Sequence, residues 1–219
     1  MTEDTATKGT GTRRTQAQRT ALSDQLMLEA AIKLINERGT QKTTLKEIGE
    51  LAGYSRGLAN YRFGSKDGLL QELFSRFDDR WKNHLETYVG DKSGKKAVLA
   101  AADALRDFLK LESEYMRAMY TLWYEALGHE SEIRSNLAAH HDVYRKDATR
   151  WIEQGIADGD IDPNINPNQF AVQFCAFIFG LVYQWLVNAD ALDLDAIIGL
   201  IEKADEGVEG ASEEPAPEK

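Results

Sequence analysis

The stretch TTLKEIGELAGYSRGLANYRFGSKDGLL, residues 43–70, divides a helical pattern into short pieces. Thr44 and Glu47 have the spacing of a capping box, which starts a helix, and Gly53 permits the sharp turn that ends it. Ser55 can cap a second short helix directly after the turn, and Gly64-Ser65 can end that helix and cap the next one. Two short helices folded across each other by a tight Gly-containing turn predict a helix-turn-helix motif.

The rest of the chain also has the apolar spacing of helices. Apolar residues recur every three or four positions, the four prolines all lie in the last third, and no long stretch alternates apolar with polar residues. The predicted helices cover residues 19–38, 44–52, 56–62, 66–88, 95–110, 114–127, 131–157, 168–188 and 194–204. We therefore predict an all-α fold, in which an N-terminal three-helix helix-turn-helix domain is joined by the long fourth helix to a C-terminal helical bundle.

Charge is distributed unevenly along the chain. The formal net charge is −10, but residues 1–66 hold 11 Lys and Arg against 7 Asp and Glu, a net of +4. Residues 67–219 hold 15 against 29, a net of −14. The N-terminal part is thus mildly basic and the remainder, the body, is strongly acidic. This asymmetry indicates that the N-terminal part acts close to phosphate groups.

The composition favours a reducing, aqueous compartment. The single cysteine, Cys175, excludes an internal disulfide, and the polar N-terminal segment lacks the apolar run of a secretory signal. The uncharged run 170–187 is at the lower length limit for a membrane helix, but it contains Gln173 and Gln184 and has no Lys or Arg anchors at its flanks. We therefore predict a cytoplasmic protein without a membrane partner, in which this run is a buried or subunit-facing helix.

The second helix of a helix-turn-helix lies in the major groove of DNA and presents residues near its N-terminus to base edges. In this chain the predicted reading face offers Arg56, Leu58, Ala59 and Asn60, with Gly57 keeping the backbone close. Arg56 can read guanine and Asn60 can read adenine. Leu58 or Ala59 can touch a thymine methyl group.

Groups suited to phosphate surround that face. They are Thr43, Thr44, Ser55, Tyr61, Arg62 and Lys66, at helix starts or on polar tips. Such contacts position a protein on DNA but do not specify sequence. Arg13, Arg14 and Arg19 can enter an adjacent minor groove, the alternative being a solvated tail.

Residues 21–70, and above all the quoted stretch with its tyrosine, aromatic and Ser-Lys ending, resemble the N-terminal domain of the TetR family of bacterial transcriptional regulators. One position departs from the family pattern, because Arg62 precedes Phe63 where members often carry histidine. The resemblance implies that the acidic body forms a dimer and encloses a ligand cavity.

Two apolar stripes in the body fit a four-helix interface between two copies of the chain. One stripe holds Phe170, Phe174, Phe177, Ile178, Leu181 and Trp185, with Gly180 allowing close approach, and the other holds Ile133, Leu137, Tyr144, Ala148, Trp151 and Ile152. The alternative is that both stripes are intramolecular core.

The segment 115–127 combines flexible and aromatic side chains that suit a cavity wall. Its predicted ligand-binding residues are Met116, Met119, Tyr120, Trp123 and Tyr124, and core filling is the alternative for each of them. Arg117 and Glu125 can anchor the polar end of a ligand or form a surface ion pair.

Histidines in the body raise a metal hypothesis. His129, His140 and His141 lie near Glu125, Glu130 and Asp142 in the sequence. The spacing fits no helical two-ligand pattern, because neighbouring helical residues point about 100° apart, and cysteine ligands are missing. No Ser/His/Asp set, glycine-rich phosphate loop or paired carboxylate stands out, so we predict no metal, no cofactor and no catalytic site.

The sequence thus predicts a disordered arm (1–18), a helix-turn-helix DNA-binding domain (19–66), a ligand-binding and dimerisation domain (67–205) and a disordered acidic tail (206–219). The leading hypothesis is a homodimeric repressor that a small, mostly apolar effector releases from a near-palindromic double-stranded DNA operator. The alternatives are a helical enzyme with an incidental helix-turn-helix corner, and an activator or effector-independent regulator.

Overall fold

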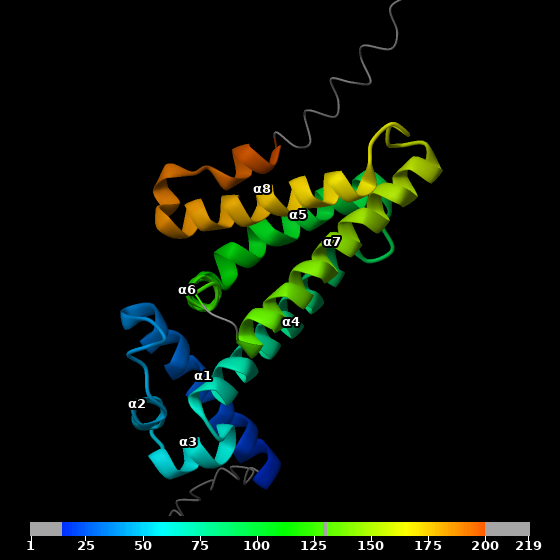
Figure 1. The fold of residues 1–219 in the computed structure, drawn as a ribbon. Coiled ribbons are helices and arrows are strands. Elements are labelled where there is room, and N and C mark those ends of the chain that lie inside the picture. The colour runs from blue at the N-terminus through cyan, green and yellow to red at the C-terminus, as the bar shows by residue number, and fades with distance from the viewer. Residues whose placement is uncertain (1–14, 129–130, 200–219) are drawn as a thin grey trace, which may run out of the picture.

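A computed structural model describes residues 15–128 and 131–199, and the regular elements in those ranges are all helical, as predicted. The first three, α1 (Gln16–Arg38), α2 (Leu45–Leu51) and α3 (Arg56–Phe63), form a small N-terminal group, and α4 (Lys66–Val89) runs from this group into the body (Figure 1). The body holds α5 (Gly94–Leu111), α6 (Ser113–Ala126), α7 (Glu132–Asp158), α8 (Pro167–Val187), the 3-10 helix η1 (Ala189–Ala191) and a helical stretch over 194–199.

The start of α1 corrects the predicted length of the N-terminal arm. Thr15 and Gln18 form a reciprocal capping box, in which the Thr15 hydroxyl accepts from the Gln18 amide at 3.2 Å and the Gln18 side chain accepts from the Thr15 amide at 2.9 Å. This cap starts the helix at Gln16, inside the predicted arm. Residues 1–14 and 200–219, with the rest of that arm and the predicted acidic tail, lie outside the described residues.

The predicted helix caps between α2 and α4 are present, but the capping box at Thr44 is only half formed, because the Glu47 carboxylate accepts from the Thr44 hydroxyl and not from the Thr44 amide. The hydroxyls of Thr44, Ser55 and Ser65 accept from backbone amides three residues later, at 3.3, 3.2 and 3.0 Å. Gly53 turns the chain between α2 and α3 with a φ of 80°, which is the conformation that favours glycine. These local signals set the boundaries of the helix-turn-helix.

The helices surround a main core that spans the N-terminal group and the body. Phe77 of α4 lies near its centre, 2% exposed, with edge-to-face ring contacts to Phe108, Tyr115 and Trp123 at centroid distances of 5.5–5.8 Å. A second cluster packs α5, α7 and α8 at the far end of the body. The main core therefore holds the DNA-facing end and the body together as one packed unit.

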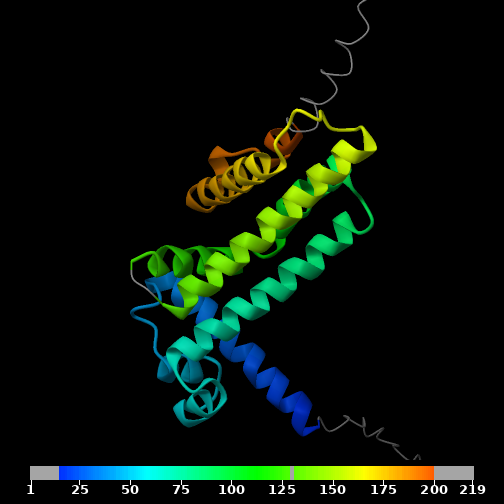
Figure 2. The ribbon, with the colours of Figure 1, turned by 45° about the vertical axis from the view of Figure 1, so that its right-hand side comes forward.

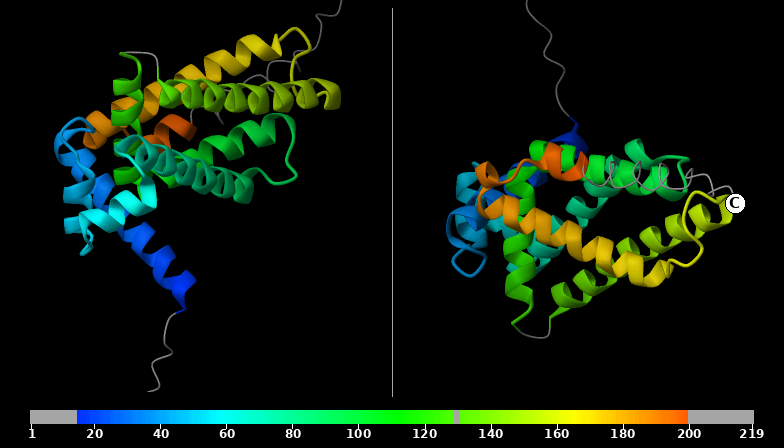
Figure 3. Two further views of the ribbon diagram at one scale, coloured as in Figure 1. Left: turned by 60° about the horizontal axis from the view of Figure 1, so that its bottom comes forward. Right: turned by 90° about the horizontal axis from the view of Figure 1, so that it is seen from above.

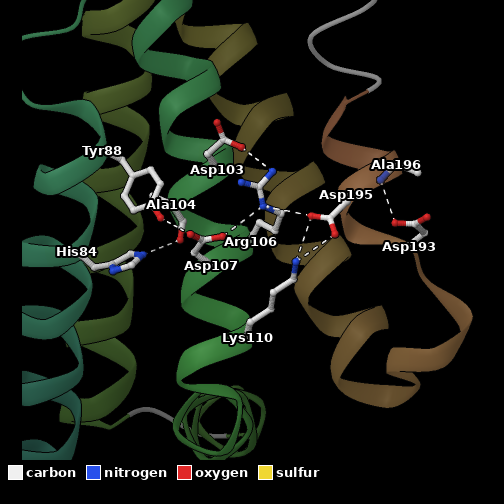
Figure 4. A network of polar contacts seen from close by, with 10 residues as sticks. All are labelled: His84, Tyr88, Asp103, Ala104, Arg106, Asp107, Lys110, Asp193, Asp195 and Ala196. Atoms are coloured by element: carbon white, nitrogen blue, oxygen red, sulfur yellow. Dashed lines mark hydrogen bonds and ion pairs between the residues drawn. The ribbon is translucent and has the colours of Figure 1, made fainter.

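The segment after α8 is tied to α5 by a polar network (Figure 4). Arg106 lies 2.8 Å from Asp103 and 3.3 Å from Asp195, and Lys110 also reaches Asp195, at 3.1 Å. On the other side of α5, His84 of α4 contacts the Ala104 carbonyl oxygen at 3.0 Å. These contacts fix the helical stretch over 194–199 against the body.

Replacing Phe77 with Ala should lower the free energy of unfolding by about 3–5 kcal/mol, because it removes a buried aromatic side chain that touches three others. Urea denaturation at one fixed protein concentration measures the change. Leu111→Ala is the control, since Leu111 is 73% exposed and its loss should change stability by less than about 0.5 kcal/mol. Equal losses for the two variants would contradict the position of Phe77 in the core.

Candidate DNA-binding surface and body cavity

The outer side of α3 is the most polar exposed face of the helix-turn-helix. Arg56, Gly57 and Asn60 are exposed, and Tyr61 is 81% exposed. The Ser55 hydroxyl, which caps α3, is exposed as well. These side chains can enter the major groove together, because residues 56, 57, 60 and 61 lie on one side of a helix.

Two members of the predicted reading face point inward instead. Ala59 is fully buried, so the prediction that it could touch a thymine methyl group is wrong. Leu58 is half-buried and packs against the main core. A helix of two turns has only one outer face, and these two residues lie on its inner side, where they belong to or pack against the main core.

The structure pairs Arg62 with Asp24 of α1. The Arg62 Nε lies 2.6 Å from Asp24 Oδ1, and its Nη2 bonds the second carboxylate oxygen. The hydrogen bond to Asp24 raises the pKa of Arg62, and the carboxylate side chain is only 11% exposed. Arg62 thus holds α3 on α1, and this pairing competes with the predicted phosphate contact.

Two other predicted phosphate groups also have internal partners. Thr43 is 2% exposed and its hydroxyl donates to the Gly39 carbonyl at 2.9 Å, while Lys66 is half-buried and donates to the Thr40 carbonyl at 3.3 Å. Thr44, Ser55 and Tyr61 remain exposed.

Sequence reasoning passed over Lys42 and Lys46, two exposed cations near the start of α2. Their positions on either side of the Thr44 cap could have identified them as cations close to the predicted DNA-binding surface. Arg19 is exposed on α1, and Arg13 and Arg14 lie outside the described residues.

A cavity of about 70 Å³ lies inside the body. Its wall comes from five helices and is lined by Phe77, Trp81, Leu85, Ala101, Leu105, Met116, Tyr120, Trp123, Tyr144, Asp147, Trp151, Phe174, Cys175, Ile178, Phe179 and Val182. This volume holds a few water molecules and is well below that of a site for a drug-sized ligand. A larger ligand would have to push one wall outward.

Three of the predicted ligand-binding residues line this cavity and two do not. Met116, Tyr120 and Trp123 are on its wall. Met119 is fully buried in the core on another side of α6, and Tyr124 is 52% exposed, with its ring near Tyr183 at 5.5 Å. Residues of α6 one turn apart face the cavity, so the intervening ones cannot.

Polar groups on the wall are few and mostly buried. The Trp123 indole nitrogen is buried and has no hydrogen-bond partner among the described residues. The Tyr120 hydroxyl donates to the Phe179 carbonyl at 3.2 Å, and burial raises the pKa of Tyr120. Burial also raises the pKa of the Cys175 thiol, which lies on the same wall.

A groove of about 540 Å³ leads along α4 and α7, which run side by side in Figure 2. It shares Trp81, Leu85, Tyr144 and Asp147 with the cavity wall. Asp78 of α4 reaches across this groove to His140 of α7, with 2.7 Å between Oδ1 and Nδ1. The groove therefore borders the cavity along this shared wall.

Contacts between α6 and the N-terminal group connect the body to the DNA-facing surface. Glu125 accepts from the Thr40 amide at 3.2 Å and also from the Thr40 hydroxyl, just after α1. Asn36 of α1 donates to the Glu114 carboxylate at 2.8 Å. Glu125 is thus bound to the N-terminal group, and Arg117 donates to the Leu186 carbonyl at 2.7 Å, which leaves the ligand-anchoring prediction for these two without support.

Comparisons with known proteins agree with this arrangement. The family profile described as "Bacterial regulatory proteins, tetR family" matches residues 27–73, and the profile described as "Tetracyclin repressor-like, C-terminal domain" matches residues 118–198. Together they span more than half of the chain. The chain belongs to the TetR family. It is a DNA-binding transcriptional regulator, as the resemblance implied.

Full-length relatives of this TetR-family chain share its whole architecture. The probable HTH-type transcriptional regulator ArpR of Pseudomonas putida is 27% identical over 204 residues, covering 88% of this chain and 93% of its own length. The structure of a putative transcriptional regulator from Pseudomonas aeruginosa PAO1 matches with a TM-score of 0.74 and 21% identity, over 90% of this chain and 93% of that one. A SmeT–triclosan complex matches with a TM-score of 0.67 and 21% identity, over 90% and 99%.

Most residues of the two apolar stripes predicted to form a dimer interface lie inside this TetR-family chain. Leu137, Ala148, Trp151 and Ile152 of α7 are buried within the chain, so that stripe is intramolecular core. On α8, Phe174 and Ile178 face the cavity, and Leu181 is buried. The exposed apolar side chains of α8 are Val172, Phe177, Tyr183 and Val187. α8 lies on the outside of the body in Figure 3, and by length and composition alone it could cross a membrane.

No group of three or more His, Cys, Asp or Glu that could hold a metal ion occurs within residues 15–128 and 131–199. His140 instead pairs with Asp78, and burial lowers the pKa of His141. His129 and Glu130 lie outside the described residues.

Replacing Arg62 or Asp24 with Ala should lower the free energy of unfolding by about 1–3 kcal/mol, because each change leaves the other charged group partly buried without its partner. The double variant should lose less than the sum of the two. Chemical denaturation at fixed protein concentration measures all three, with Arg56→Ala as an exposed control. Additive losses would contradict the pairing.

Proposed function

We propose that this TetR-family regulator is a homodimeric repressor, and that a small, mostly apolar effector entering the body cavity releases it from a near-palindromic operator. One observation carries the proposal. α4 begins beside the exposed face of α3, and the same helix contributes Phe77, Trp81 and Leu85 to the cavity wall. At 24 residues it spans about 36 Å, so a tilt at the cavity end moves the DNA-facing end.

On DNA, Arg56 and Asn60 would read base edges, by bidentate contacts to guanine and adenine respectively. Thr44, Ser55 and Tyr61 would contact phosphates and set the register, and Lys42 would add a cation at the same edge. We take residues 16–65 as the DNA-binding unit and residues from 66 onward as the effector-binding and dimerisation unit.

The exposed apolar face of α8 supports the homodimer. The exposed surface of α8 carries four large apolar side chains beside three glutamines, and soluble monomers rarely leave a large apolar patch in water. The apolar side chains are Val172, Phe177, Tyr183 and Val187. Two such helices packed against each other across a two-fold axis would bury them. The same packing would account for the apolar composition of α8 in a cytoplasmic protein.

Release would follow from the small size of the cavity. An effector larger than about 70 Å³ has to displace α4 or α6, so it binds best to the displaced state. A difference of roughly 1–3 kcal/mol between the two states is enough for a useful switch. An effector-independent regulator or an activator would keep the DNA surface but not this coupling.

Selection of bound fragments from random DNA, followed by sequencing, tests the DNA-binding part of the proposal. We expect a two-fold-symmetric motif with half-sites about one helical turn apart. Asn60→Ala or Arg56→Ala should lose about 1–3 kcal/mol of binding to that motif and discriminate less at one base position. Lys146→Ala, which removes an exposed cation of α7, is the control and should bind like the unaltered protein.

Binding of each variant to the motif and to random DNA distinguishes base recognition from general electrostatic attraction to DNA. A loss by the Asn60 variant that is equal on the motif and on random DNA would remove Asn60 from the reading face. A motif without symmetry would contradict the dimer.

Phe177→Glu should convert the dimer to a monomer, because it places a charge in the middle of the exposed apolar face of α8. Size-exclusion chromatography with light scattering measures the mass directly. Val143→Glu is the matched control, since Val143 is 54% exposed but lies on α7, and it should remain dimeric. A dimeric Phe177 variant with an unchanged melting temperature would move the interface elsewhere.

A further inference from the structure

We infer that the effector is an organic cation, with its apolar body among the aromatic side chains of the cavity and its positive charge beside Asp147. This inference rests on the proposed function, in which the cavity is the effector site. Two observations on the wall, its aromatic rings and its single charge, lead to it independently of each other.

Aromatic rings make up half of the cavity wall. Eight of its sixteen residues are aromatic, namely Phe77, Trp81, Tyr120, Trp123, Tyr144, Trp151, Phe174 and Phe179. The negative faces of such rings attract a cation within about 6 Å of their centres, most strongly where water is excluded. In a cavity of about 70 Å³ any occupant lies within that range of several rings.

Asp147 of α7 is the one charged residue on the described cavity wall. Its side chain is 27% exposed, and it borders the cavity, the groove along α4 and α7, and a hollow beside the start of α5. The carboxylate therefore stands between water and the aromatic interior. A ligand charge placed there keeps part of its hydration while the rest of the ligand is buried.

The ion-pair partner of Asp147 is an exposed arginine. Burial raises the pKa of Asp147, and this effect outweighs the opposing influence of Arg150 and Lys82. Arg150 lies 3.0 Å away on the next turn, but its side chain is 59% exposed. Because Arg150 is the exposed member of the pair, a ligand cation can take its place beside Asp147 while the guanidinium turns into water.

The wall disfavours anionic ligands. A carboxylate or phosphate would need a Lys, Arg or His on the wall, and the described lining contains none. Asp147 would also repel an anion. A neutral aromatic compound is the remaining competitor, and it differs from the cation in having no reason to depend on Asp147.

A pair of probes with the same shape separates the cation from its neutral competitor. Benzyltrimethylammonium carries the positive charge, and neopentylbenzene replaces its nitrogen with carbon. Three of the four tryptophans line the cavity, so intrinsic fluorescence reports binding of either probe to the full chain, with calorimetry as a second readout. We expect the cation to bind at least about tenfold more tightly than the neutral probe.

Asp147→Asn should weaken binding of the cation by about tenfold or more and leave the neutral probe within about twofold. The matched control is Asp142→Asn, because Asp142 sits on the same helix and pairs with an arginine three residues later, Arg145, but is exposed and off the wall. It should bind both probes like the unaltered protein. Thermal unfolding of both variants checks that each is folded, and Asp147→Glu, which keeps the charge, should retain the preference for the cation.

Equal affinity for the two probes, loss of both in Asp147→Asn, or no binding of the cation would each overturn the inference. Operator binding is measured separately, by anisotropy of a labelled DNA fragment with and without benzyltrimethylammonium. Cation binding at Asp147 that leaves DNA affinity unchanged would contradict the proposed switch while the ligand assignment stands. Release of the DNA by the neutral probe alone would contradict the ligand assignment while the proposed switch stands.

Discussion

The structure depends on α4 being one continuous helix in a main core that spans the N-terminal group and the body. Leu69, Leu70 and Leu73 in its first half pack with the N-terminal group, and Phe77 continues the same row into the body. A continuous helix cannot change its direction at one end only, because its backbone hydrogen bonds resist bending. A ligand that displaces α4 beside Trp81 therefore also changes the position of α4 where it meets α3, without any change in secondary structure.

A second connection runs through α6 and works together with the first. One side of this helix gives Met116, Tyr120 and Trp123 to the cavity, and its ends are bonded to α1 and the segment that follows it through Glu114 and Glu125. The N-terminal group is thus attached to the body at two places, α4 and α6, which both border the cavity. A ligand that separates these two helices changes both attachments together, and the N-terminal group has to rotate to follow them.

The sequence alone predicted what depends on neighbouring residues and missed what depends on distant ones. Helix boundaries, the caps at Thr44, Ser55 and Ser65, and the turn at Gly53 follow from interactions within four residues. Arg62 was assigned to phosphate because its partner, Asp24, lies 38 positions away. The apolar stripe of α7 was assigned to a dimer interface for a similar reason, since periodicity shows that a face is buried but not what covers it.

The Arg62–Asp24 pair also constrains how the switch can work. It fastens α3 to α1, and α1 in turn is fastened to α6, so the recognition helix cannot move independently of its own domain. Local melting of α3 would break a partly buried ion pair and expose Ala59 and Leu58. Rotation of the whole N-terminal group keeps the Arg62–Asp24 pair and the packing of α3, and it shifts the core contacts with α6 and the body instead. In the proposed dimer, control of DNA binding would therefore depend on the relative position of two intact N-terminal groups. The face of α8 proposed to set the distance between them would then be as much a part of the switch as the cavity.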